Sequence, residues 1–301
     1  MLGTQQSETD VKEFAGKLES AQKLIQGRQF PEALTALQSM LEAKPDDAEA
    51  LYMTAVCLRY TQQHQAAIET LSRLKSIQPE HGRAHQEEAH ALRAMGETSK
   101  ALKAYERACF YNPALEASFR ARVEIHNARG ETPQASHVQR QLDGLLALPK
   151  PLIAVVDLIS MGKLLRAEDI CRQFLKKIPH NVEAMRLLAD IGMRLGILED
   201  AEFLLASASR LAPDNIRVHI DYIQALRKRQ QHSAALEQAR SLLQREPNNP
   251  QFQSIFAVQC MQSGDFDEAL QTFEKILKAL PNDPITLTSM GHALKTKGDS
   301  N

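Results

Sequence analysis

The sequence predicts an all-α solenoid made of eight complete helical hairpins and half of a ninth. Two residue types recur at a nearly constant spacing of 34, and a fixed period of this kind is typical of stacked two-helix units. One series consists of prolines, with one step of 66 between the third and fourth: Pro45, Pro79, Pro113, Pro179, Pro213, Pro247 and Pro281. The other consists of alanines, with one step of 32 between the fourth and fifth: Ala33, Ala67, Ala101, Ala135, Ala167, Ala201, Ala235 and Ala269.

Each unit is predicted to be a helix, a tight turn and a second helix. With the prolines at position 32, the alanines occupy position 20, and position 8 is small in six units: Ala21, Ala55, Ala89, Ala189, Ala257 and Gly291. Small residues at both positions let the two helices approach to about 8–10 Å, and large apolar residues at positions 11 and 24 fill the groove between them. Position 15 is glycine in six units: Gly96, Gly130, Gly162, Gly196, Gly264 and Gly298. Glycine in the left-handed conformation ends the first helix, and proline at position 32 cannot continue the second.

The units follow one another from the N-terminus. Residues 1–13 are expected to form a polar tail and the start of the first helix. Residues 14–147 hold repeats one to four, residues 148–283 hold repeats five to eight, and residues 284–301 hold the first helix of an incomplete ninth. The repeats begin at residues 14, 48, 82, 116, 148, 182, 216, 250 and 284.

The fourth repeat departs from the pattern. It is two residues short, lacks its proline, and has Arg122, His126 and Gln139 where apolar residues are expected. We therefore expect a local irregularity, either a hinge or a loosely packed repeat, since solenoid units vary without a functional cause.

The pattern resembles the tetratricopeptide repeat over about residues 14 to 301. It departs from that family at position 4, where no unit has tryptophan, and at position 8, where alanine mostly replaces glycine. The resemblance implies a right-handed α–α superhelix, with an inner face lined by positions 2, 5, 6, 9, 12 and 13 of each first helix. It also implies that the chain is a binding scaffold for a protein or a peptide.

The inner-face positions contain the residues expected to contact a partner. The candidates are Arg83, His90, Arg93, Arg120, Arg186, Arg194, Arg217, Arg227 and Lys228. Acidic residues are mixed among them, including Glu87, Glu124 and Asp221. One interpretation is a solvated face of mixed charge. The other is a groove in which arginine guanidinium groups bind the carboxylates of an acidic peptide.

The first helix of repeat five, "PKPLIAVVDLISM", is apolar nearly all round, and such a helix is normally covered on every side. Leu152, Ile153, Val156 and Ile159 would face the groove. Either superhelical curvature buries them against neighbouring helices, or they form an exposed apolar docking patch, which monomers rarely leave uncovered.

The C-terminal segment ends halfway through a hairpin. Residues 299–301 read as a turn after the ninth first helix, and no second helix follows to cover Leu287, Met290 and Leu294. We expect the chain to be a fragment. The stretch "GHALKTKG" (291–298) resembles a segment of bacterial proteins in which tetratricopeptide repeats precede a sulfotransferase domain that uses PAPS. That resemblance implies a catalytic domain beyond residue 301.

Composition excludes several classes of function. The chain of 301 residues has 36 Lys and Arg against 37 Asp and Glu, so bulk attraction to nucleic acid or membrane is not expected. The absence of a signal peptide and the wide spacing of the four cysteines favour reduced thiols in the cytoplasm. No nucleotide, nucleophile or metal motif occurs, and His81 and His85 lack a third ligand, so we expect no enzyme activity, cofactor or metal.

Two functions are therefore predicted. The first is a protein-interaction scaffold that binds a peptide or a partner helix in its concave groove. The alternative is the substrate-recruiting arm of a PAPS-dependent sulfotransferase. Binding of PAPS by a longer native chain, and not by these residues alone, would separate them.

Overall fold

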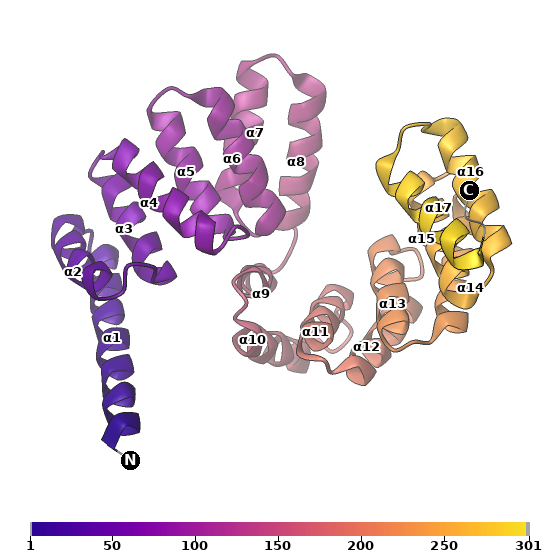
Figure 1. The fold of residues 1–301 in the computed structure, drawn as a ribbon, viewed down its shortest axis with the longest axis horizontal. Helices are drawn as coiled ribbons and strands as arrows, with labels where there is room; N and C mark the ends of the chain where they lie inside the picture. Colours follow the sequence, from indigo (N-terminus) through magenta and orange to yellow (C-terminus); the bar gives the residue numbers. More distant parts are fainter. Residues whose placement is uncertain (1, 299–301) are drawn as a thin grey trace. The chain divides into compact units, whose positions relative to one another are not determined.

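A computed structural model describes the backbone of residues 2–298 and the side chains of residues 13–298. Within that part of the chain all regular structure is α-helical and there are no strands (Figure 1). The turn expected at residues 299–301 lies outside it. The helices are α1 (Leu2–Gln26), α2 (Phe30–Ala43), α3 (Ala48–Tyr60), α4 (His64–Ile77), α5 (Gly82–Ala94), α6 (Thr98–Tyr111), α7 (Glu116–Ala128), α8 (Thr132–Leu146), α9 (Lys150–Ser160), α10 (Leu164–Lys177), α11 (Val182–Leu195), α12 (Leu198–Leu211), α13 (Ile216–Lys228), α14 (His232–Arg245), α15 (Pro250–Ser263), α16 (Phe266–Ala279) and α17 (Pro284–Lys297).

Among the described residues, seven hairpins are closed by contacts between their two helices, from α1–α2 to α7–α8 and from α11–α12 to α15–α16. With α9, α10 and α17, the order of helices confirms the predicted fold class. Every second helix begins at position 17 of its repeat, and most first helices begin at position 1. Two first helices differ: α1 begins at Leu2, so the polar residues before Phe14 continue the helix, and α9 begins at Lys150, the third residue of its repeat.

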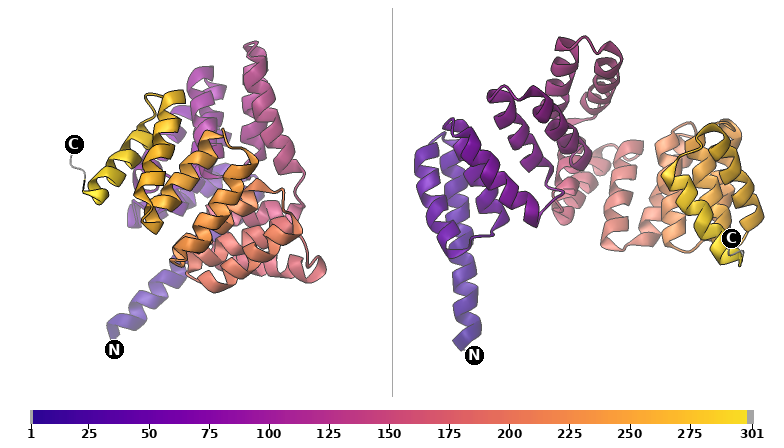
Figure 2. Two further views of the ribbon diagram at one scale, coloured as in Figure 1. Left: turned by 90° about the vertical axis from the view of Figure 1, so that its right-hand side faces the viewer. Right: turned by 45° about the horizontal axis from the view of Figure 1, so that its top comes forward.

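The chain divides into two compact units, the first ending at Lys163 and the second beginning at Leu164. The first contains α1–α9 and the second contains α10–α17, and Figure 2 shows the helix pairs of both from two further sides. The boundary between the units falls inside repeat five, between α9 and α10. In the first unit α9 packs through Ile153 against the apolar side chains of α7 and α8.

Within each unit the two helices of a repeat meet through the small residues at position 20. All eight of these alanines are buried, as are the large residues at position 24 that fill the space beside them. First helices of successive repeats also contact each other, as α3 does with α5 and α11 with α13. First helices therefore form the inner layer of each unit, and second helices form the outer layer.

The turn inside each hairpin requires a left-handed backbone at position 15. All six glycines there have positive φ, from 70° at Gly162 to 93° at Gly298, which confirms their predicted role. Arg28, Gln62 and Gln230 occupy position 15 in the remaining repeats and have φ of 58–63°. The two-helix geometry thus imposes this conformation even where the residue disfavours it.

Replacing Gly96 by alanine is expected to lower the stability of the third repeat by about 1–2 kcal/mol, because a Cβ is disfavoured at its φ of 79°. No atom lies within 4 Å of the added Cβ, so the cost is conformational and not steric. Urea unfolding would measure it. The matched control is Gly144 to alanine inside α8, where open space and helical backbone should give stabilisation of up to ~1 kcal/mol. Equal effects at the two sites would contradict this account.

The turns between repeats are closed by side chains near the start of each first helix. Asp47, Asn181 and Asp283 each accept a hydrogen bond from a backbone N–H of the first turn. His81 does the same through Nδ1, and His85 Nε2 lies 2.9 Å from the Pro79 carbonyl oxygen, to which it donates. These two histidines, weighed above as metal ligands, are therefore engaged in the turn.

Repeat four keeps its hairpin, and two of its three unexpected polar residues find local partners, whereas the buried Nε of Arg122 makes no hydrogen bond among the described residues. His126 is buried and its Nδ1 lies 2.6 Å from Glu131 Oε2, while Gln139 donates to Asp143 Oδ1 at 2.8 Å. Neither Leu115 before α7 nor Pro149 before α9 makes a side-chain capping hydrogen bond. The turn before α7 keeps the backbone hydrogen bonds of the other turns between repeats, so the departure lies in the shorter turn between α8 and α9.

All four cysteines are buried and free of disulfides. Burial raises the pKa of Cys57 and Cys109 to about 11 and that of Cys171 and Cys260 to about 12. They therefore act as apolar core residues and not as nucleophiles. Among the described residues, no helix combines the length and the apolar character that a bilayer crossing requires.

Candidate protein-binding surfaces

The inner face of the first unit is crossed by ion pairs between successive first helices. Arg59 of α3 pairs with Glu87 of α5, and both side chains are largely buried. Burial raises the pKa of Glu87 while Arg59 opposes that shift. Arg93 of α5 pairs with Glu124 of α7 at 2.8 Å. Arg120 is exposed and pairs with Glu116 of its own helix at 2.7 Å. Arg93 and Arg120 are thus already engaged by carboxylates.

His90 lies on the same inner face but does not carry a charge at neutral pH. Its Nδ1 is 2.7 Å from the hydroxyl oxygen of Tyr105, with the rings edge to face. Burial, with further contributions from Arg59 and Arg93, lowers the pKa of His90 to about 4. The neutral ring therefore joins the two helices of repeat three.

Arg83 connects α5 to α9 within the first unit. Its Nη2 donates to Asp157 Oδ2 at 2.6 Å, and the amide of Asn112 donates to the other carboxylate oxygen at 2.8 Å. Beside this pair lies a cavity of about 760 Å³, lined by the starts of α3 and α5 and the end of α9. The guanidinium group thus holds α9 in place.

The four apolar candidates of α9 are covered to different extents. Leu152 and Ile159 are buried, and Ile153 and Val156 are half-buried. Ile153 packs against a cluster that includes Phe119. This arrangement favours the interpretation in which neighbouring helices cover the helix, and it leaves little apolar area for a docking partner.

The inner face of the second unit contains an arginine held by two carboxylates. Arg186 Nη2 lies 2.6 Å from Glu183 Oε1, and its Nη1 lies 2.8 Å from Asp221 Oδ2 on the next first helix. These carboxylates raise the pKa of Arg186 against the effect of burial. Arg194 pairs with Asp190 one turn away at 3.0 Å.

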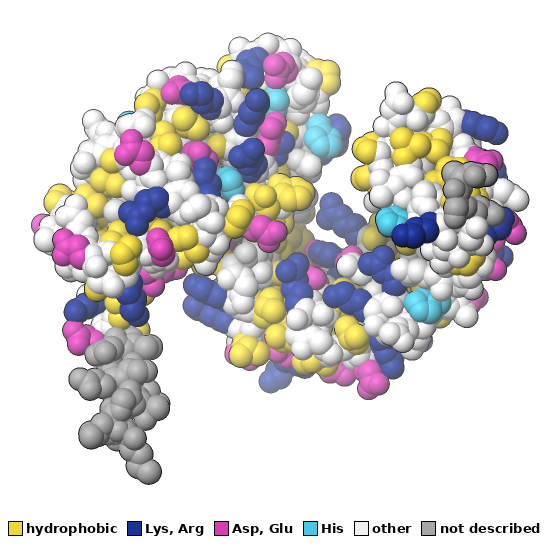
Figure 3. Space-filling model, in the orientation of Figure 1, with side chains coloured by type: hydrophobic (Ala, Val, Ile, Leu, Met, Phe, Trp, Pro, Cys, Tyr) yellow, Lys and Arg dark blue, Asp and Glu magenta, His cyan; other side chains and the backbone are white. Residues whose placement is uncertain are grey.

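Three basic candidates of α13 have no acidic partner within the described residues. Arg217 and Arg227 are exposed and make no hydrogen bond or ion pair there, and Lys228 donates only to the Met193 carbonyl oxygen at 3.4 Å. Figure 3 shows lysine and arginine side chains gathered over α11–α13. On the following first helix, α15, inner positions 6, 9 and 12 are apolar and half-buried (Ile255, Val258 and Met261), and the other inner positions are polar. A basic strip therefore lies beside an apolar one.

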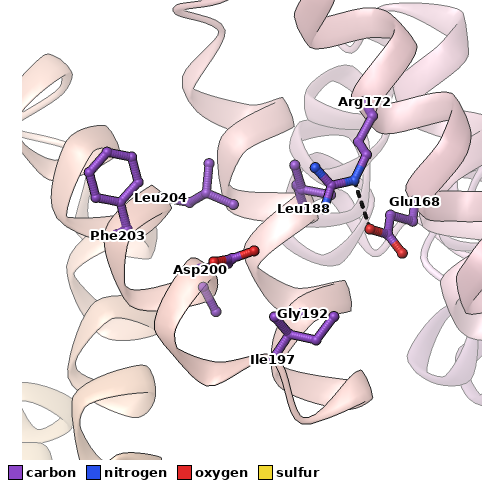
Figure 4. A pocket seen from close by; sticks show the side chains of 9 residues that line it. Glu168, Arg172, Leu188, Gly192, Ile197, Asp200, Phe203 and Leu204 are labelled. Atoms are coloured by element: carbon purple, nitrogen blue, oxygen red, sulfur yellow. Dashed lines mark hydrogen bonds and ion pairs between the residues drawn. The ribbon is translucent and has the colours of Figure 1, made fainter.

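A second surface, which the sequence reasoning missed, lies on the outer face between α10 and α12. Two neighbouring cavities of about 180 and 670 Å³ share the side chains of Arg172, Leu188, Phe203 and Leu204 (Figure 4). Gly192 lines the smaller cavity at position 11, where most repeats have leucine. This glycine in place of the usual leucine was the one feature of the sequence that set repeat six apart at this position.

Comparison with known proteins supports the repeat assignment. Residues 170–286 match the TPR domain of cytochrome c-type biogenesis protein H, and residues 18–81 match the tetratricopeptide repeat. Both matched ranges are tetratricopeptide repeats. Over 113 residues the chain is 30% identical to cytochrome c-type biogenesis protein CcmH of Escherichia coli (strain K12), covering 36% of this chain and 32% of that protein. The Shigella flexneri protein matches equally. The chain thus spans about a third of the length of these curated relatives.

Two solved structures resemble the chain over long ranges. Cut9 with Hcn1 from the APC/C has 14% identity and a TM-score of 0.43, with 88% of this chain and 52% of that chain covered. MamA has 14% identity and a TM-score of 0.40, with 66% of this chain and 92% of that chain covered.

Proposed function

We propose that the chain is a protein-interaction scaffold that binds an extended acidic segment of a partner on the inner face of its second unit. The observation that carries this proposal is the set of basic side chains on α13 that lack an acidic partner, Arg217, Arg227 and Lys228. Guanidinium groups bind carboxylates through charge-assisted hydrogen bonds, and exposed ones need not first break an internal pair.

The other inner-face arginines are poorer binding groups for a physical reason. Arg93 and Arg186 each bridge to a carboxylate of a neighbouring first helix. A ligand carboxylate would have to displace that internal partner and leave it unpaired, which offsets the gain. These arginines instead hold successive repeats together. For their part of the inner face we therefore favour a surface of mixed, internally paired charge over a peptide-binding groove.

The apolar strip on α15 defines the remaining chemistry of the ligand. Ile255, Val258 and Met261 are half-buried, so apolar ligand residues following the acidic ones would complete their burial. The proposed ligand is a short segment with Asp or Glu beside apolar residues. The similarity of residues 170–286 to the TPR domain of a cytochrome c biogenesis protein makes components of that process the first partners to test.

Selection of randomised peptides displayed on phage is expected to enrich sequences with Asp or Glu next to apolar residues. Replacing both Arg217 and Arg227 by glutamate should weaken binding of a selected peptide at least about tenfold, equivalent to ~1.4 kcal/mol. The matched control replaces Arg107 and Arg120, two exposed arginines of the first unit, and makes the same change in net charge. Equal weakening by both pairs, or none by the first, would contradict the proposal.

The sulfotransferase alternative stays a prediction. It depends on residues 291–298, which lie within α17 and its C-terminal cap. Titration with PAPS of a chain that extends beyond residue 301, if the source reading frame encodes one, tests it separately from peptide binding.

A further inference from the structure

The outer face of the second unit has a groove that the inner-face function does not use. Its walls are the second helices α10 and α12, its floor is α11, and we call it the α10–α12 groove. Leu188 and Met185 form the apolar floor, and both are nearly buried. Gly192 also lines the smaller cavity, and a Cβ there would lie 3.2 Å from the Ile197 carbonyl oxygen and 3.5 Å from the Cβ of Ala201, so the glycine lets α11 and α12 pack closely.

The walls of the α10–α12 groove expose apolar side chains to solvent. Phe203 of α12 is 70% exposed and Leu211 is 48% exposed, and both line the larger cavity. Leu175 of α10 and Leu204 of α12 are half-buried beside them. Soluble monomers rarely leave a contiguous apolar surface of this kind open, and such surfaces mark interaction sites.

The charges of this groove are divided between its two cavities: Glu168 and Asp200 line the smaller cavity, whereas the charges that line the larger one are all basic. The larger cavity is lined by Arg172, Lys176 and Arg210, together with His180, and by no carboxylate. Arg172 pairs with Glu168 at 2.7 Å, at the end where the smaller cavity lies (Figure 4). Arg210 contacts only the Ser207 hydroxyl, at 3.3 Å. Two cations, Lys176 and Arg210, thus stand on opposite walls without an acidic partner among the described residues.

We propose that the α10–α12 groove binds an acidic amphipathic helix of a partner protein. The two wall helices have 14 residues each, so the groove offers a length of about 20 Å, which matches a helix of about four turns. Apolar residues spaced three and four apart on that helix would meet Phe203, Leu204 and Leu175. Acidic residues on its flanks would reach Lys176 and Arg210.

Fluorescence anisotropy with a synthetic helical peptide tests the proposal. The probe has leucines at helical spacing and glutamates on both flanks, over about four turns. It is expected to bind the whole chain with micromolar affinity and to weaken as salt is raised. Replacing Phe203 by serine, or Lys176 and Arg210 by glutamate, should weaken binding at least tenfold. Because these side chains are exposed, circular dichroism should show an unchanged fold.

Matched controls separate this site from a general apolar or charge effect. Phe110 of α6 is 81% exposed in the first unit, so its replacement by serine should leave affinity unchanged. The Arg217 and Arg227 reversal should also leave it unchanged, which distinguishes this groove from the inner-face site. A probe with lysines in place of glutamates should not bind. Equal loss from the Phe110 variant, or binding of vesicles of anionic lipid in preference to the peptide, would overturn the proposal.

Discussion

Replacing Arg186 by methionine is expected to destabilise the second unit by about 3 kcal/mol. The guanidinium group is the shared partner of Glu183 and Asp221, and its side chain is only 19% exposed. Methionine retains much of the apolar packing but leaves two half-buried carboxylates without a cation, and losing one partner of a buried pair costs roughly 3–5 kcal/mol. Partial exposure places this site at the lower end of that range.

Hydrogen exchange of amides in α11–α13 measures this effect locally, because solenoid stability is a sum of repeat and interface contributions. The matched control is Arg194 to methionine. Arg194 also pairs with an aspartate but is 51% exposed, so its loss should cost under about 1 kcal/mol. Replacing Asp221 by leucine together with Arg186 should recover much of the lost stability. Comparable costs for the Arg186 and Arg194 variants would show that the Arg186 pair does not join the repeats.

Acid should selectively weaken the first unit through His90. The folded pKa of this ring is lowered from 6.5 to about 4, first by burial. Between these values the unfolded chain binds the proton and the folded chain does not. Stability therefore falls as pH drops through 6.5 and levels off below about 4. Each pKa unit corresponds to ~1.4 kcal/mol, so the free energy of unfolding should fall by at most about 3 kcal/mol between pH 7 and pH 4.

Urea unfolding at several pH values, compared with the His90 to glutamine variant, isolates this contribution. Glutamine can keep a hydrogen bond to Tyr105 but does not titrate, so the variant should lose less stability between pH 7 and pH 4. His180 to glutamine is the control, because that side chain is exposed. A parallel pH dependence in the native chain and the His90 variant would mean that the buried ring is not the cause.

Most of the fold could be predicted because its determinants are local and repeated. A glycine at position 15, a proline at position 32 and two small residues act within one hairpin, and eight near-copies make the period visible. The predicted turn glycines were confirmed by their positive φ. The packing of α9 could not be predicted in the same way, because it depends on an ion pair between Asp157 and Arg83, which lies 74 residues earlier in the chain.

The candidate sites were harder to predict, because a charged side chain can bind a partner only if no neighbouring repeat supplies it with an opposite charge. The sequence placed Arg186 and Arg217 alike on inner-face positions. The structure separates them: Arg186 meets Asp221, 35 residues away on the next first helix, and Arg217 meets no carboxylate in the described chain. The α10–α12 groove was missed for the same reason, since its two walls come from different repeats.

The sequence by itself determined the repeat, its register and its turns, because these follow from backbone preferences and contacts between residues close in the chain. The tertiary structure alone decided which charges and apolar side chains remain open to a partner. Arg59 and Glu87 are 28 residues apart, and their pairing depends on how one repeat stacks on the next. A side chain becomes a binding group only when that stacking leaves its charge or its apolar surface without an internal partner.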